Sequence, residues 1–188
     1  MKINAIEIRG GNVLDHEGKL WQVLKSQIYQ PGKGASVVQV EMRDVRTGTK
    51  TNVRFRTQET VERARLDEVE YQYLYDEGDG NFAFMNNDNY EQMSVSGDII
   101  GEQNIYLQEG MKVILQMFES EALSVQLPTT VVLEITEADP VVKGQTASSS
   151  YKPAMLENGA KIMVPPHIEA GTKVVVKPED GSYVERAK

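Results

Sequence analysis

Alternating apolar and polar residues dominate the chain, and this two-residue period predicts β-strands rather than helices. The clearest alternation runs over 20–29 and again over 37–45, on either side of the segment 30–36. That segment contains a proline and two glycines, which favour turns. We therefore expect the two runs to pair as a long hairpin with Lys33 at its tip, followed by a second turn at 46–49.

The next expected strand places Arg54 and Arg56 in alternation with Val53 and Phe55. Because successive side chains of a strand point to opposite faces, this pattern predicts one basic face and one buried face. Lys33 itself has a simpler interpretation. Most lysines in turns are solvated side chains without a partner, and the octapeptide YQPGKGAS alone does not exclude this.

The middle of the chain shows the same alternation in shorter segments. The expected strands are 70–75, 81–85, 111–118 and 122–127, with a helix over 98–107. Four or five short strands with one helix in roughly 60 residues are typical of a small oligonucleotide/oligosaccharide-binding (OB) barrel.

Three tyrosines, Tyr71, Tyr73 and Tyr75, alternate along the first strand of this middle segment and should share one face. Such a row could stack on nucleic-acid bases or pack in a half-buried sheet. The acidic surroundings favour packing.

The last third of the chain predicts a second small barrel. Expected strands cover 131–135, 160–164 and 173–177, and a polar loop lies at 143–150. Its size and strand spacing match those of the middle third.

Charge is distributed unevenly along a chain whose formal net charge is −8. Residues 1–64 contain 11 basic and 7 acidic residues, 65–127 contain 2 and 13, and 128–188 contain 7 and 8. This polarity suggests that the first third faces a polyanion, whereas the middle third aids solubility or meets a basic protein surface. A chance difference between domains is the alternative.

Composition excludes several classes of protein. With no cysteine, the chain has no disulfide, no thiol nucleophile and no cysteine-based zinc site. The N-terminal segment lacks the apolar core of a signal peptide, and no apolar run approaches the length of a membrane span. We expect a soluble, cytoplasmic protein that does not bind membranes.

Sequence motifs for enzymatic chemistry are incomplete. The tip fails as a phosphate-binding P-loop because Gln27 stands where glycine is needed and Gly34 where serine or threonine holds magnesium. A dinucleotide-binding pattern fails at Val37, and the two histidines, His16 and His167, do not have the spacing of metal ligands. We expect no catalytic residues, metal or cofactor, and therefore no enzyme.

Several stretches together resemble bacterial elongation factor P over essentially the whole length of the chain. The resemblance rests on PGKG, VEMRDVRTGT, YLYDEGDGNFAFMNNDNYEQ, KPAMLENGAKIMVPPHIEAGTKVVV and GSYVER, which occur in this order. It implies an all-β fold of three small barrels in an L shape that mimics transfer RNA: an SH3-like (KOW-like) domain at 1–64 and OB domains at 65–127 and 128–188.

The resemblance also implies a function. Members of the family bind the 70S ribosome between the peptidyl and exit sites, contact the peptidyl-tRNA and relieve stalling at consecutive prolines. The residues that match the tip of the family are Pro31, Gly32, Lys33 and Gly34. Lys33 corresponds to the modified residue, which a ligase resembling lysyl-tRNA synthetase extends with a β-lysyl group. Tyr183 and Arg186 match a C-terminal pair that lies toward the small subunit.

One segment departs from the family. The pattern G-D-T-x-x-G, associated with messenger RNA near the exit site, is replaced by GQTASS at 144–149, which puts that contact in doubt. No residue of the acidic middle third is matched to a contact. An elongation-factor-P-like paralogue and a non-ribosomal RNA- or protein-binding module remain alternatives, and a monomer is expected.

Overall fold

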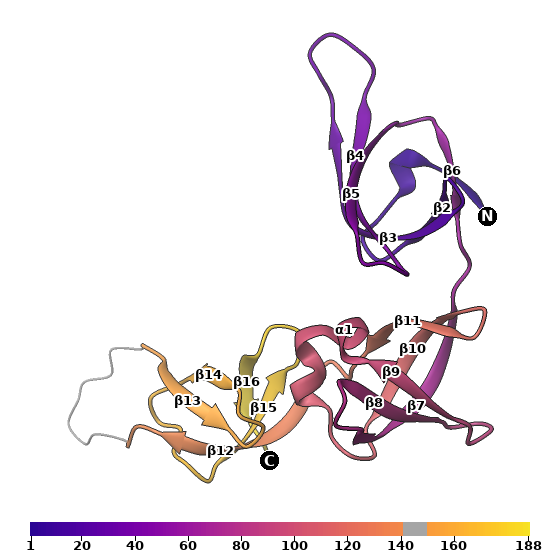
Figure 1. Ribbon diagram of the computed structural model, residues 1–188. Coiled ribbons are helices and arrows are strands. Elements are labelled where there is room, and N and C mark those ends of the chain that lie inside the picture. The colour runs from indigo at the N-terminus through magenta and orange to yellow at the C-terminus, as the bar shows by residue number, and fades with distance from the viewer. Residues whose placement is uncertain (141–149) are drawn as a thin grey trace. The chain divides into compact units, whose positions relative to one another are not determined.

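The computed structural model describes residues 1–140 and 150–188, and it is an all-β structure with three antiparallel sheets (Figure 1). The departure at 144–149 therefore lies outside the described residues. By its internal contacts the chain divides into two compact units, residues 1–67 with 117–123 and residues 68–116 with 124–188. The boundaries expected near residues 64 and 127 stay predictions.

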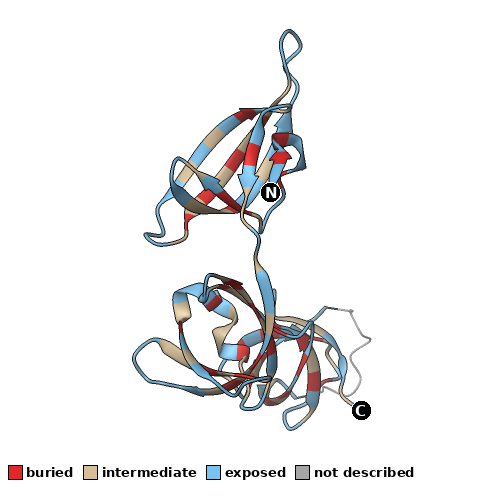
Figure 2. Ribbon diagram, turned by 90° about the vertical axis from the view of Figure 1, so that its right-hand side faces the viewer, coloured by how far each residue is buried: buried red, intermediate tan, exposed pale blue. Residues whose placement is uncertain are grey.

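The first sheet has six strands in the order β1-β6-β2-β3-β4-β5. Its strands are β1 (Lys2–Asn4), β2 (Val13–His16), β3 (Lys19–Tyr29), β4 (Val37–Asp44), β5 (Lys50–Arg56) and β6 (Thr60–Arg63), with the short 3-10 helix η1 (Ala5–Glu7) after β1. The sheet curls around one apolar core, to which Ile8, Leu14, Val40 and Met42 contribute fully buried side chains. Figure 2 shows buried residues, in red, along the strands of the curled sheet.

The second sheet has five strands in the order β11-β10-β7-β8-β9. Its elements are β7 (Asp67–Asp76), β8 (Asn81–Asn86), β9 (Gln92–Ser96), α1 (Gly97–Ile100), η2 (Gly101–Tyr106), β10 (Lys112–Phe118) and β11 (Glu121–Gln126). The four expected strands form as β7, β8, β10 and β11, with β7 beside β8 and β10 beside β11. The expected helix is a single α-helical turn continued by a 3-10 segment.

The third sheet has five strands in the order β14-β13-β12-β15-β16. Its strands are β12 (Val131–Ala138), β13 (Lys152–Leu156), β14 (Lys161–Val164), β15 (Lys173–Lys177) and β16 (Ser182–Arg186). Alternate valines of β15, Val174 and Val176, are fully buried, and β15 pairs with β12, so the apolar run VVV is the centre of this core.

The tyrosine row of β7 was predicted wrongly in part. Tyr71 and Tyr73 are buried, as the packing interpretation predicts, but Tyr75 is 55% exposed. A β-bulge shifts the register between Tyr73 and Tyr75, so that Tyr73 lies opposite Phe84 and Tyr75 opposite Ala83. An extra residue in one strand reverses the alternation after it, which removes Tyr75 from the core.

Candidate functional site

The tip segment 30–36 joins the two most extensively paired strands of the structure. Strands β3 and β4 pair from Trp21 opposite Asp44 to Tyr29 opposite Val37. Near this end the side chains of β3 lie outside the core: Ile28 is 53% exposed and Tyr29 48% exposed. The hairpin therefore projects from the curled sheet and ends in the tip loop (Figure 1).

Lys33 lies at the middle of the tip loop and is exposed, as are Pro31, Gly32 and Gly34. Within the described part of the chain, its ammonium group has no hydrogen-bond or ion-pair partner. The prediction that Lys33 stands at the apex of a hairpin is confirmed by its position. Its role stays a prediction.

The two glycines beside Lys33 are not equivalent. Gly34 has a φ of 146°, a backbone conformation that L-residues rarely adopt, whereas the φ of Gly32 lies outside that region. A side-chain carbon added at Gly32 would meet nothing within 4 Å. The loop conformation thus requires glycine at position 34 but not at position 32.

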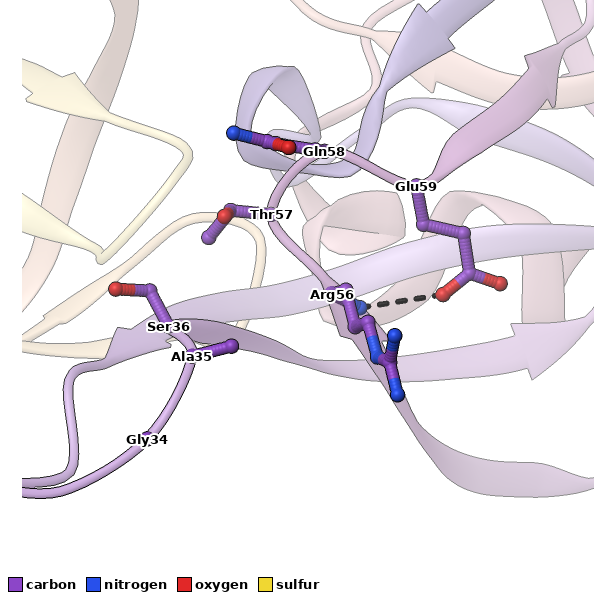
Figure 3. Close-up of a pocket in the computed structure, with 7 residues that line it drawn as sticks. All are labelled: Gly34, Ala35, Ser36, Arg56, Thr57, Gln58 and Glu59. Carbon is purple, nitrogen blue, oxygen red and sulfur yellow. Dashed lines mark hydrogen bonds between the residues drawn. The ribbon is translucent and has the colours of Figure 1, made fainter.

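A third strand supports the base of the tip loop. Strand β5 pairs with β4 up to Val37 opposite Arg56, and the amide of Thr57 donates to the carbonyl of Ser36 at 3.3 Å. After β5 the chain turns, and the Arg56 amide donates to the Glu59 carboxylate at 3.2 Å. These contacts surround an open hollow whose lining is shown in Figure 3: Gly34, Ala35, Ser36, Arg56, Thr57, Gln58 and Glu59.

The expected basic face of β5 is confirmed. Arg54 and Arg56 are exposed, Phe55 is buried and Val53 is partly buried. In the described residues neither arginine takes part in an ion pair. Two unneutralised guanidinium groups on the strand that supports the tip provide a surface suited to phosphate groups.

The second predicted pair, Tyr183 and Arg186, lies on the edge strand β16 of the third sheet. Tyr183 is only partly exposed, and its ring meets the ring of Tyr151 edge-on, with centroids 6.4 Å apart. Burial, followed by the effect of Tyr151, raises the pKa of Tyr183. Tyr183 therefore contributes to the barrel, whereas Arg186 is exposed. These two residues and the tip residues belong to different compact units.

Sequence reasoning did not single out Tyr29 and Gln39, which line a second hollow together with Pro31 and Arg54. The sequence shows that both residues lie in alternating runs, but it does not show the strand register that brings them to one face.

Among the described residues, no group of three or more histidine, aspartate or glutamate side chains is arranged to hold a metal ion. None of the helices in the described ranges has the length and apolar character needed to cross a membrane.

Comparison with known proteins gives consistent matches along the chain. Three family descriptions match in order: the elongation factor P KOW-like domain at residues 4–61, the elongation factor P OB domain at 66–125 and the elongation factor P C-terminal domain at 131–186. These matches agree with the SH3-like, KOW-type fold expected for the first sheet and the OB-type fold expected for the others.

Curated relatives match over the full length. Elongation factor P from Rhodospirillum centenum is 59% identical over 188 residues, and the match covers 100% of both chains. The proteins of the same name from Rhizobium leguminosarum and Acidiphilium cryptum are 57% and 55% identical, with 99% and 100% of their lengths covered and 100% of this chain.

Among solved structures, eukaryotic translation initiation factor 5A from Methanococcus jannaschii has a TM-score of 0.50 at 20% identity. The match covers 68% of this chain and 92% of that one, and it supports the fold alone.

Proposed function

The chain belongs to the elongation factor P family, and from this premise we propose that it binds the ribosome between the peptidyl and exit sites and stimulates peptide-bond formation at consecutive prolines. The observation that carries the proposal is the position of Lys33, exposed at the end of a projecting hairpin. In this role the protein is a cytoplasmic translation factor that acts as a monomer and contributes no catalytic group of its own.

Positioning is the physical basis of this activity. Proline is a hindered and rigid nucleophile, so its reaction is slow when the peptidyl-tRNA is poorly aligned. Binding of the factor holds the peptidyl-tRNA in a geometry ready for attack. The entropy of alignment is then lost on binding and no longer adds to the activation barrier. Lys33 reaches toward the acceptor end of the peptidyl-tRNA, and the chemistry remains that of the ribosome.

We propose further that Lys33 is extended by a β-lysyl group, added by a ligase resembling lysyl-tRNA synthetase. The exposure of the tip loop supports this, because no described contact of the lysine would have to be broken to admit a modifying enzyme. A longer arm with a second amine would extend its reach to RNA.

The basic face of β5 gives the hairpin a second means of contact. Arg54 and Arg56 would bind backbone phosphates of the peptidyl-tRNA or neighbouring ribosomal RNA, and such contacts position a protein without reading sequence. Arg186 is the better candidate of the C-terminal pair for a contact near the small subunit, since the ring of Tyr183 is partly used within its own barrel.

Two measurements test the proposal. Co-sedimentation with purified ribosomes at moderate salt should recover the protein, and its absence from the pellet would indicate a non-ribosomal binding module. In reconstituted translation, the protein should accelerate synthesis of a Pro-Pro-Pro sequence far more than that of a proline-free peptide. Binding without this preference would instead favour the elongation-factor-P-like paralogue.

A further inference from the structure

A hollow lies on the outward face of the hairpin, where the tip loop begins. It has a volume of about 490 Å³, within the range of about 300–1,000 Å³ found for small-molecule sites. It is lined by Tyr29, Gln30, Pro31, Val37, Gln39 and Arg54. Neither Lys33 nor any residue of the hollow in Figure 3 lines it, so it is separate from the hollow at the base of the tip loop.

Strand register brings the lining of this hollow together. Tyr29 of β3 pairs with Val37 of β4, and Gln39, two residues further along β4, pairs with Arg54 of β5. Directly opposed residues point to the same face, as do residues two apart along one strand. An aromatic ring, an amide and a guanidinium group therefore share one face of three adjacent strands.

The ring of Tyr29 is both accessible and held in position. It is 48% exposed, and its hydroxyl donates a hydrogen bond of 2.7 Å to Oε1 of Gln27 on the same strand face. Pro31 and Val37 add apolar surface beside it. A fixed aromatic ring next to apolar groups offers a planar ligand a place to stack.

The polar groups of the hollow favour a nucleotide over other planar ligands. The side-chain amides of Gln30 and Gln39 can donate to and accept from the edge of a base. No carboxylate is among the lining residues, and Arg54 has no ion pair in the described ranges, so its charge is free to meet a phosphate.

We propose that this hollow binds one unpaired nucleotide of RNA, with its base stacked on Tyr29 and its phosphate at Arg54. An unpaired nucleotide is required because a base within a helix is stacked on its neighbours and cannot stack on a side chain. The inference extends the proposed function, which brings this hairpin to RNA. It also makes a claim about the isolated protein that can be tested without ribosomes.

The test is a titration of the isotope-labelled full-length protein with a short unstructured RNA oligonucleotide at low salt, followed by NMR. We expect amide shifts to change around Tyr29, Val37 and Gln39. Y29A should raise the Kd roughly tenfold, the effect of losing one stacked base. Y29F keeps the ring and loses only the hydrogen bond to Gln27, so it should raise the Kd much less than Y29A does. The matched control is I28A, since Ile28 is 53% exposed and points to the opposite face of the same strand.

Arg54 gives an independent readout. R54Q should lower the slope of log Kd against log salt concentration by about one, the value expected when a single arginine no longer neutralises a phosphate. The proposal is overturned if Y29A binds as tightly as I28A, if the shifts map away from the hollow, or if an RNA duplex of the same sequence binds with the same dependence on Tyr29. Because no ribosome is present, these results do not depend on whether peptide synthesis is stimulated.

Discussion

At the scale of single residues, the tip loop combines an exposed lysine, for which we propose a function, with a backbone position that favours glycine. Lys33 is exposed and makes no described contact, so the fold gives no reason for a lysine there. At Gly34, by contrast, the fold explains the residue, because L-residues with a side chain rarely adopt a φ of 146°. Substitutions can therefore separate a requirement of the fold from a requirement of function.

Gly32 and Gly34 give such a comparison. G34A should destabilise the loop conformation by about 1–2 kcal/mol, because an alanine there adopts an unfavourable φ. G32A should leave the unfolding free energy within about 0.5 kcal/mol of the parent value, since the added carbon meets nothing within 4 Å. Thermal unfolding measures both. If G32A nevertheless impairs stimulation of Pro-Pro-Pro peptide synthesis, the added methyl group hinders the approach of the tip to the peptidyl-tRNA. Equal destabilisation by the two variants would contradict the conclusion that the fold requires glycine at position 34 but not at position 32.

Asp44 is one of two buried polar side chains in the described residues, and it holds the β4–β5 turn. Its Oδ1 accepts from the amide of Arg46 at 2.8 Å and from that of Thr47 at 3.2 Å. The Arg46 amide, then the Thr47 amide, and more weakly Lys19, lower the pKa of Asp44. A carboxyl group with a lowered pKa in the folded state stabilises the fold above its unfolded pKa of about 3.9, and this contribution is lost as pH falls through the folded pKa.

The expected result is a loss of stability in acid that depends on Asp44. Between about pH 5 and pH 3 the unfolding free energy of the parent should fall more steeply than that of D44N, because asparagine keeps one acceptor oxygen but cannot be protonated in this range. Urea unfolding at a series of pH values measures the slopes. Parallel curves for the two proteins would show that Asp44 contributes nothing to the acid dependence.

At the scale of elements, strands with clear alternation or an apolar run could be predicted from the sequence, whereas some short strands without either could not. The segments corresponding to β3, β4 and β5 carry enough alternation to indicate their extent, and in β5 the alternation also indicates the buried face. Strands β1 and β6 have three and four residues, too few for a period to be evident, and Pro153 argues against the strand β13 in which it lies. These elements form because the neighbouring strands offer hydrogen bonds, which is a tertiary effect.

The difference between local and tertiary effects also explains which parts of the site could be predicted from the sequence. Lys33 was identifiable because turn residues surround it. The hollow around Tyr29 was not, since its members come from three strands and meet only through the β3–β4–β5 register. The exposure of Tyr75 was likewise hidden, because the β-bulge before it leaves no mark in the alternation.

The basic face of β5 leads to a prediction at this scale. The double variant R54Q/R56Q should fold normally, bind ribosomes more weakly and show a salt slope lower by about two, one for each arginine that no longer neutralises a phosphate. Ribosome binding at several salt concentrations measures the slope. A matched control is K2Q, since Lys2 is an exposed cation on β1, at the opposite edge of the same sheet. A slope as high as that of K2Q would rule out the phosphate contacts.

At the scale of the whole molecule, the chain is a series of three small antiparallel sheets, each of which contributes buried apolar residues. Within the second compact unit, the segment that follows α1 contacts the third sheet. The Asn158 side chain donates to the carbonyl of Ile105 at 3.0 Å, and the Gln108 side chain donates to that of Val132 at 3.0 Å. Tyr106, which is buried, lies against Gly181 at this contact.

Substitution of Gly181 measures how much this contact contributes to the unfolding free energy. A side-chain carbon at position 181 would lie 2.9 Å from the Tyr106 hydroxyl, and its φ is 69°. At Gly171 the φ is 88° but no atom lies within 4 Å, so G171A carries the backbone strain alone. We expect G171A to cost about 1–2 kcal/mol and G181A about 1 kcal/mol more. Chemical denaturation measures both.

The double variant G181A/Y106F provides the control. It lacks the Tyr106 hydroxyl, so it should recover part of the unfolding free energy that G181A loses beyond G171A. Equal unfolding free energies for G171A and G181A would mean that the tyrosine moves aside freely and that the contact is loose.

The measurement that tests the central claim most directly is the rate of Pro-Pro-Pro synthesis in reconstituted translation, with the protein purified from its own host and with K33A prepared in the same way. We predict a marked acceleration by the parent protein. K33A should unfold at the same temperature as the parent and lose most of the stimulation, because the side chain makes no described contact within the fold. Full stimulation by K33A, or no stimulation by the parent on ribosomes that respond to a known factor, would contradict the proposed role of the hairpin tip.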